Sequence, residues 1–154
     1  MIYDMVHVNV NCTSLERSLA FYRRLGFRVM HVFGDGVASI DPDADPLAGR
    51  HEAGGAHTRG VVLTLGDHPH CFTKLELLEH VVPRTLPDRP HGPHEVGIRR
   101  IALRCKDIDG EVARLREAGV VFETEVLGTD SVGDARYVFL RDPDGAILEL
   151  IEFG

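Results

Sequence analysis

The chain contains an internal repeat, and this feature constrains its fold more than any single motif does. Residues 6–27 align without a gap with residues 99–120, at a constant offset of 93 residues. A second match joins L-E-L-L-E-H, which begins at Leu75, to L-E-L-I-E-F, which begins at Leu148, at an offset of 73 residues. The sequence therefore predicts two copies of one structural unit, with 20 extra residues inside the first copy.

Size, charge and cysteine usage exclude several functions. The 154 residues suffice for one domain made of two small modules. A net charge of −7 would repel a phosphate backbone, so we expect no nucleic-acid partner. No apolar run approaches the roughly 20 residues of a membrane helix, and the first residues lack a signal-peptide pattern. We expect no membrane association, a cytoplasmic location and reduced thiols at Cys12, Cys71 and Cys105, with a Cys12–Cys105 bridge as the less favoured alternative.

Both copies begin with a strand followed by a helix. In the first copy, apolar residues alternate with polar ones over residues 6–10, which is typical of a half-buried strand. Thr13 and Glu16 resemble a capping box, apolar residues follow at helical spacing, and Gly26 ends the helix. In the second copy the strand covers 100–105, Asp107 is the expected N-cap, and Gly119 ends the helix.

Three strand-like runs follow each helix. They cover residues 27–33, 61–65 and 72–78 in the first copy, and 120–126, 136–140 and 146–153 in the second. The predicted fold class is α+β, with two βαβββ modules in tandem that form a pseudo-symmetric curved sheet or cup. We expect one domain over 1–154, with modules at 1–81 and 98–154, a proline-containing linker at 82–97 and a long loop at 34–59.

Four polar residues occupy related strand positions of the two copies. His7 lies on the polar face of the first strand, and Arg100 takes the equivalent place in the second copy. Glu76 and Glu149 lie among leucines, where a carboxylate is costly to bury unless it is paired or bound to a metal. If the copies are related by a pseudo-twofold axis, the four side chains would converge. Glu79 is the alternative to Glu76 if the strand register slips.

The chain resembles the vicinal oxygen chelate superfamily, which includes glyoxalase, bleomycin-resistance proteins and extradiol dioxygenases. The resemblance rests on the paired βαβββ units, on H-x7-L-x-R-S-x-x-F-Y from His7, and on the ending D-P-D-G-x-x-L-E-L from Asp142. It implies a divalent metal (Mn, Fe, Co, Ni or Zn) with His7, Glu76 and Glu149 as ligands. The fourth ligand position is Arg100, so the resemblance leaves open that this chain binds no metal.

Three interpretations of Arg100 follow, because guanidinium has no lone pair to offer a metal. It could stand beside a three-ligand ion, although two cations at close range repel. It could replace the ion's charge and pair with the glutamates, or it could bind a substrate carboxylate or phosphate. Asn9 shares a strand face with His7, and Arg104 shares one with Arg100, so both are candidate substrate-binding residues. His94, in the linker, is an alternative source of the missing ligand.

Two classes of function remain open. The first is a metal-dependent lyase, isomerase or dioxygenase that acts on a small oxygen-chelating substrate, with Glu76 or Glu149 as the catalytic base. The alternative is a metal-free protein that binds and sequesters a small molecule. Both need a small-molecule partner. The exposed strand edges of such a repeat also favour a homodimer.

Overall fold

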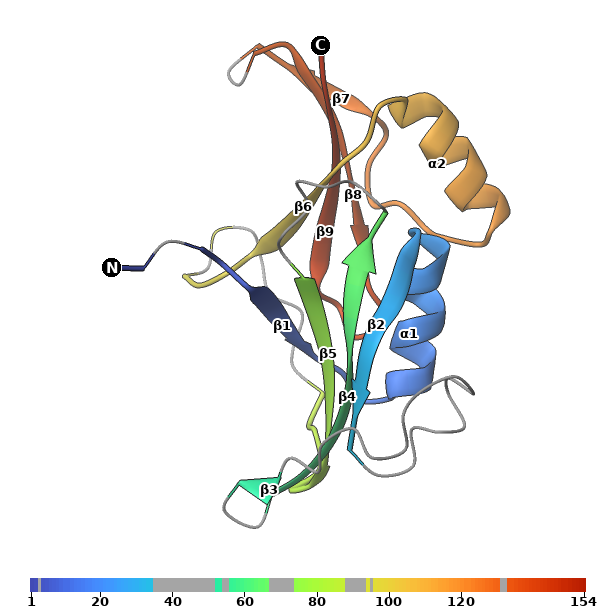
Figure 1. Cartoon of the computed structure of the whole chain (residues 1–154). Coiled ribbons are helices and arrows are strands. Elements are labelled where there is room, and N and C mark those ends of the chain that lie inside the picture. Colours follow the sequence, from blue (N-terminus) through green and yellow to red (C-terminus); the bar gives the residue numbers. More distant parts are fainter. Residues whose placement is uncertain are drawn as a thin grey trace. The chain divides into compact units, whose positions relative to one another are not determined.

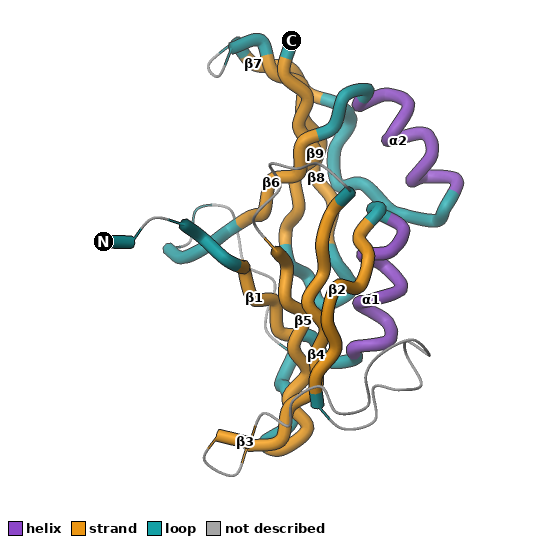
Figure 2. Tube along the Cα trace, viewed as in Figure 1, coloured by secondary structure: helices purple, strands orange, loops and turns teal. Residues whose placement is uncertain are grey.

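The computed structural model describes residues 1–2, 4–34, 52–53, 56–66, 74–87, 94, 96–130 and 133–154. It divides into two compact units, Met1–Pro87 and Asp88–Gly154. Each unit has one mixed sheet with one helix on it, as Figures 1 and 2 show. The predicted fold class, α+β with two βαβββ modules in tandem, is confirmed. Neither described helix is long and apolar enough to span a membrane.

In the first unit, the strand order is β1-β5-β4-β2, with β1 at one edge and parallel to β5. A short strand, β3, pairs with β4 outside this order. The elements are β1 (His7–Asn11), α1 (Leu15–Arg24), β2 (Phe27–Phe33), β3 (Glu52–Ala53), β4 (Ala56–Leu65) and β5 (Lys74–Val82).

The second unit repeats this topology in the order β6-β9-β8-β7, with β6 at one edge and parallel to β9. Its elements are β6 (Arg100–Arg104), α2 (Ile108–Glu117), β7 (Leu127–Thr129), β8 (Ala135–Arg141) and β9 (Ile147–Phe153). The D-P-D-G turn joins β8 to β9, and Gly145 adopts a φ of 95° there, a conformation that costs glycine little.

The strand pairing reproduces the offsets of the sequence repeat. His7 pairs with Lys74 in the first unit, and Arg100 pairs with Ile147 in the second. These positions differ by the same 93 and 73 residues that align the two copies in the sequence. Equivalent residues of the repeat therefore occupy equivalent positions in the two sheets.

Each core lies between a helix and one face of its sheet. In the first unit, α1 contacts β2 and β5, and Leu19 and Tyr22 of α1 are fully buried, as are Leu63 and Leu77 of the sheet. In the second, a matching set comprises Ile108, Leu115, Val138, Leu140 and Leu148. Polar side chains on the opposite strand face are left outside these cores, because successive strand residues point to opposite faces.

Three local predictions were wrong. The N-cap of α1 is Ser14 rather than Thr13, because the Ser14 side chain accepts a hydrogen bond from the backbone N–H of Arg17. The predicted strand 120–126 is reduced to a single bridge at Phe122, and β7 begins only at Leu127. The predicted loop 34–59 ends in strand, since β4 already begins at Ala56.

Candidate functional site

On β1, His7 and Asn9 both contact a glutamate on the neighbouring strand. His7 Nε2 lies 3.6 Å from Glu76 Oε2. The Asn9 side-chain amide donates a hydrogen bond of 3.3 Å to the same oxygen. Asn9 and Glu76 are register partners, whereas His7 reaches Glu76 diagonally across the parallel pair. The side chain of His7 is 47% exposed and that of Glu76 is 21% exposed, so solvent or a ligand can reach both.

The second unit makes the same diagonal contact with different chemistry. Arg100 Nε on β6 lies 2.8 Å from Glu149 Oε2 on β9. The Glu149 side chain is only 7% exposed, while that of Arg100 is 56% exposed. The guanidinium carbon also lies 5.6 Å from the ring centroid of Phe139, the partner of Glu149 on β8. A buried carboxylate and an aromatic ring thus hold a solvent-accessible guanidinium in one place.

The two pairs differ in their fit to a metal. Two ligand atoms about 2.1 Å from one ion, at a tetrahedral angle, lie about 3.4 Å apart. His7 and Glu76 fit this spacing. Arg100 does not fit, because a guanidinium has no lone pair to offer and its Nε is already paired with Glu149. Among the described residues, no three His, Cys, Asp or Glu side chains group closely enough to hold an ion.

The structure also describes the two remaining candidate residues, Arg104 and His94. Arg104 extends from the same face of β6 as Arg100, and its guanidinium carbon lies 5.2 Å from the ring centroid of Phe153. His94 is exposed. Whether His7 and Glu76 converge with Arg100 and Glu149 depends on how the two units are placed, and the convergence stays a prediction.

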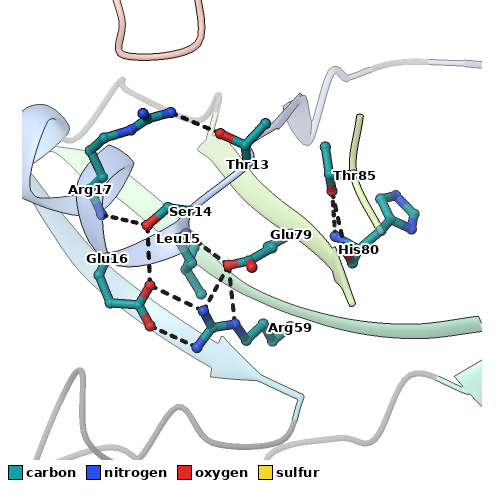
Figure 3. Close-up of polar contacts among 9 residues, drawn as sticks. All are labelled: Thr13, Ser14, Leu15, Glu16, Arg17, Arg59, Glu79, His80 and Thr85. Atoms are coloured by element: carbon teal, nitrogen blue, oxygen red, sulfur yellow. Dashed lines mark hydrogen bonds and ion pairs between the residues drawn. The ribbon is translucent and has the colours of Figure 1, made fainter. Parts of the chain in front are cut away.

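Glu79 serves another purpose, so the register did not slip. Its carboxylate accepts hydrogen bonds from the backbone N–H of Leu15, at 2.9 Å, and from Arg59 (Figure 3). Arg59 also holds Glu16 through hydrogen bonds of 2.7 and 3.0 Å. Burial alone would raise the pKa of Glu16, but a backbone hydrogen bond and the contacts with Arg59 outweigh it and lower that pKa from 4.5. This network ties the start of α1 to β4 and β5.

Sequence reasoning missed the aromatic rings beneath the two arginines. A signal was present in the β8–β9 hairpin. Its D-P-D-G turn fixes the pairing, and counting outward from it places Phe139 opposite Glu149. The same counting would have predicted that an arginine reaching Glu149 also meets the Phe139 ring.

Comparison with known proteins decides the family. The family model described as "Glyoxalase/Bleomycin resistance protein/Dioxygenase superfamily" matches residues 4–150. The chain belongs to this superfamily.

Two proteins of the comparison are similar to this chain in sequence. "Uncharacterized protein YwkD" of Bacillus subtilis (strain 168) is 29% identical over 153 residues, which cover 99% of this chain and 98% of YwkD. "Uncharacterized protein YaeR" of Escherichia coli (strain K12) is 41% identical over 66 residues, which cover 43% of this chain and 50% of YaeR.

Solved structures share the fold over nearly the whole chain. A glyoxalase family protein of Bacillus cereus matches with a TM-score of 0.73 at 19% identity, over 100% of this chain and 97% of that one. Glyoxalase I of Leishmania major, described as trypanothione-dependent, has a TM-score of 0.64 at 22% identity, over 98% and 87%. TnmS3 of Streptomyces sp. CB03234, described as an antibiotic binding protein, has a TM-score of 0.62 at 19% identity, over 99% and 98%. At these identities the likeness shows the fold alone.

Proposed function

We propose that this superfamily member binds a small acidic molecule through Arg100 and needs no divalent ion to do so. The contact between Arg100 and Glu149 carries the proposal. Glu149 pairs with Nε of the guanidinium, which leaves the two terminal nitrogens of a half-exposed side chain to bind a carboxylate or phosphate in fork geometry.

Preorganisation supports this function. Glu149 is buried and Phe139 lies beneath the guanidinium, so a ligand would meet an arginine whose position is already fixed. Fixing a side chain before binding reduces the entropy that binding must cost. The positive charge that a metal would supply is then supplied by the protein. A binding role also agrees with the description of the structurally similar TnmS3 as an antibiotic binding protein.

A second candidate is a metal-dependent lyase, isomerase or dioxygenase, and the pair of His7 and Glu76 favours it. Their donor atoms are spaced as two ligands of one ion would be. In such an enzyme the ion would act as a Lewis acid toward a chelating substrate, and Glu76 or Glu149 would be the base. We rank it second because Glu149 is already engaged by a permanent cation.

Ligand screening of chelator-treated protein tests the first proposal. Small carboxylates and phosphates are screened by thermal shift, and each compound that raises the melting temperature is then titrated by calorimetry. A ligand at one hundred times its Kd should stabilise the fold by about 2.7 kcal/mol. Arg100→Gln should abolish this binding.

The matched control is Arg116→Gln. Arg116 also pairs with a glutamate, Glu125, and its guanidinium carbon lies 5.7 Å from the ring centroid of Phe122, but it belongs to α2. This variant should bind like the parent. Equal binding by the parent and Arg100→Gln would refute the proposal, and binding that needs an added divalent ion would favour the second candidate.

We further propose that the protein is a cytoplasmic homodimer. Cys12 and Cys105 are both free thiols, as expected in a reducing compartment; Cys71 lies outside the described residues. The sheet-edge strands β1 and β6 are preceded by exposed apolar residues, Val6 and Ile98 among them, which favours an interface.

A further inference from the structure

Two arginines on one face of the second sheet each lie over a phenylalanine ring. Arg100 and Arg104 alternate along β6 with Ile101 and Leu103, so both arginines extend from the same strand face. Their guanidinium carbons lie 5.6 and 5.2 Å from the ring centroids of Phe139 and Phe153, respectively. Arg104 lies four positions after Arg100, so their Cα atoms are about 13 Å apart along the strand. The face therefore presents two cationic groups at a fixed spacing.

The arginines on this face differ in whether a carboxylate pairs with them. Arg100 is paired with Glu149. Arg141, which the strand register places on the same face, is paired with Glu123 and also donates to the Gly145 carbonyl. Within the described part of the chain, Arg104 has no carboxylate partner. An exposed guanidinium of this kind is suited to bind an anionic ligand group.

The surface between the two arginines is low at Ala102 and flanked by aromatic rings on β8. Ala102 is exposed between them on β6, and its short side chain leaves the space above the strand open. On the neighbouring strands, Glu149 and Phe139 lie beside Ala102, and Ile151 and Tyr137 lie beside Arg104. The rings of Tyr137 and Phe139 lie 5.4 Å apart. A hydrocarbon or planar group could pack on this floor while charged ends reached the arginines.

The first unit shows that strand pairing does not require the second arginine. By the repeat offsets, Arg104 corresponds to Asn11 and Phe153 to His80. Those strands pair in the equivalent register without an arginine over an aromatic ring at these positions. The pair in the second unit is therefore an addition to the fold that calls for another explanation.

We propose that the second unit binds an elongated ligand with two acidic groups, one held by Arg100 and the other by Arg104. An apolar or planar spacer would cross Ala102 and lie against Tyr137. This inference rests on the proposed function for the Arg100 end of the ligand. It adds a second anion-binding position and thereby defines the substrate class as dianionic molecules.

Calorimetric titration with linear dicarboxylates tests the inference. The probes are succinate, adipate, suberate and sebacate, and each of the two longer diacids is compared with the monocarboxylate of equal length, octanoate or decanoate. Sebacate should bind about tenfold or more tightly than decanoate, because a second charge-assisted contact is gained. Arg104→Gln should remove that advantage, and Arg116→Gln should keep it. Circular dichroism and thermal melts check that the variants are folded.

Results that differ from this expectation show which of the two proposals fails. If decanoate binds through Arg100 and sebacate binds no better, the second anion position is refuted and the proposed function survives. The same holds if the advantage of sebacate persists in Arg104→Gln. If no probe binds, the elongated dianion is refuted, and the screen of small carboxylates and phosphates decides the proposed function. If binding is unchanged in Arg100→Gln, both proposals are overturned.

Discussion

At the scale of single residues, His7 and Arg100 occupy equivalent positions and each contacts a glutamate diagonally across a parallel strand pair. The two side chains differ in what they can bind. An imidazole can offer a lone pair to a metal, whereas a guanidinium stays protonated and can only donate. One difference within the repeat therefore exchanges a side chain that can offer a lone pair for a fixed positive charge.

Removing Arg100 should destabilise the fold through the partner it leaves behind. Arg100→Ala leaves a carboxylate that is 7% exposed without its cation, and we expect a loss of about 1–2 kcal/mol. This is less than a fully buried pair would cost, because Arg100 is itself 56% exposed. Urea denaturation measures the loss, with Arg116→Ala as the control. A loss below about 0.5 kcal/mol would mean that the pair adds little.

The positions of His7, Glu76, Arg100 and Glu149 were predictable, because the repeat assigns them to equivalent strand sites. The aromatic residues that contact the arginines were harder to predict from the sequence. Phe139 and Phe153 contribute through cross-strand geometry, so their roles depend on pairing that local patterns specify only indirectly.

At the scale of elements, polar contacts at the first turn of α1 add to the buried apolar face that holds this helix on its sheet. The Ser14 hydroxyl caps the helix, Glu79 accepts from the Leu15 backbone, and Arg59 bridges Glu16 to Glu79. Sequence reasoning found the helix from its apolar spacing but misplaced the cap by one residue. Thr13 and Ser14 are both competent caps, and only the backbone geometry decides between them.

Two alanine variants separate the caps. Ser14→Ala should cost about 1 kcal/mol of unfolding free energy, because a backbone N–H of the first turn loses its acceptor. Thr13→Ala should cost less, since Ser14 and not Thr13 occupies the N-cap position, and the Thr13 hydroxyl accepts a hydrogen bond from the Arg17 side chain. Urea denaturation of both variants provides the comparison, and the reverse order would place the cap at Thr13.

The contact between Arg59 and Glu16 should make stability depend on pH. The pKa of Glu16 is lower in the folded protein than its usual 4.5, so ionised Glu16 stabilises the fold above that pH. This contribution is lost as the pH falls below 4.5 through the folded-state pKa. Glu16→Gln should therefore be less stable than the parent near neutral pH, and the difference should shrink in acid. Urea midpoints across this range test it; a constant difference would contradict the assignment.

At the scale of the whole molecule, the repeat predicted two βαβββ modules, and the ladders reproduce its offsets. The segment after α2 was harder, because residues 120–126 have strand-like composition but only Phe122 forms a bridge. Strand propensity there is overridden by the tertiary structure. How the two units are arranged is a long-range property that no local pattern specified.

Assembly is a testable property at this scale. We expect a homodimer, because apolar residues before both edge strands are exposed within the chain. Multi-angle light scattering at micromolar concentration should give twice the mass of one chain. A mass equal to a single chain would contradict the proposal.

The central claim is that Arg100 supplies the charge that a metal would otherwise supply, and calorimetric titration of chelator-treated protein with Mn²⁺, Ni²⁺ and Zn²⁺ tests it most directly. We expect the parent protein to bind none of these ions specifically. Arg100→His removes the fixed cation and places a metal-binding side chain at the position equivalent to His7, so this variant should gain a site for one ion per chain. One ion bound per chain by the parent, and lost in Glu76→Gln, would contradict the claim.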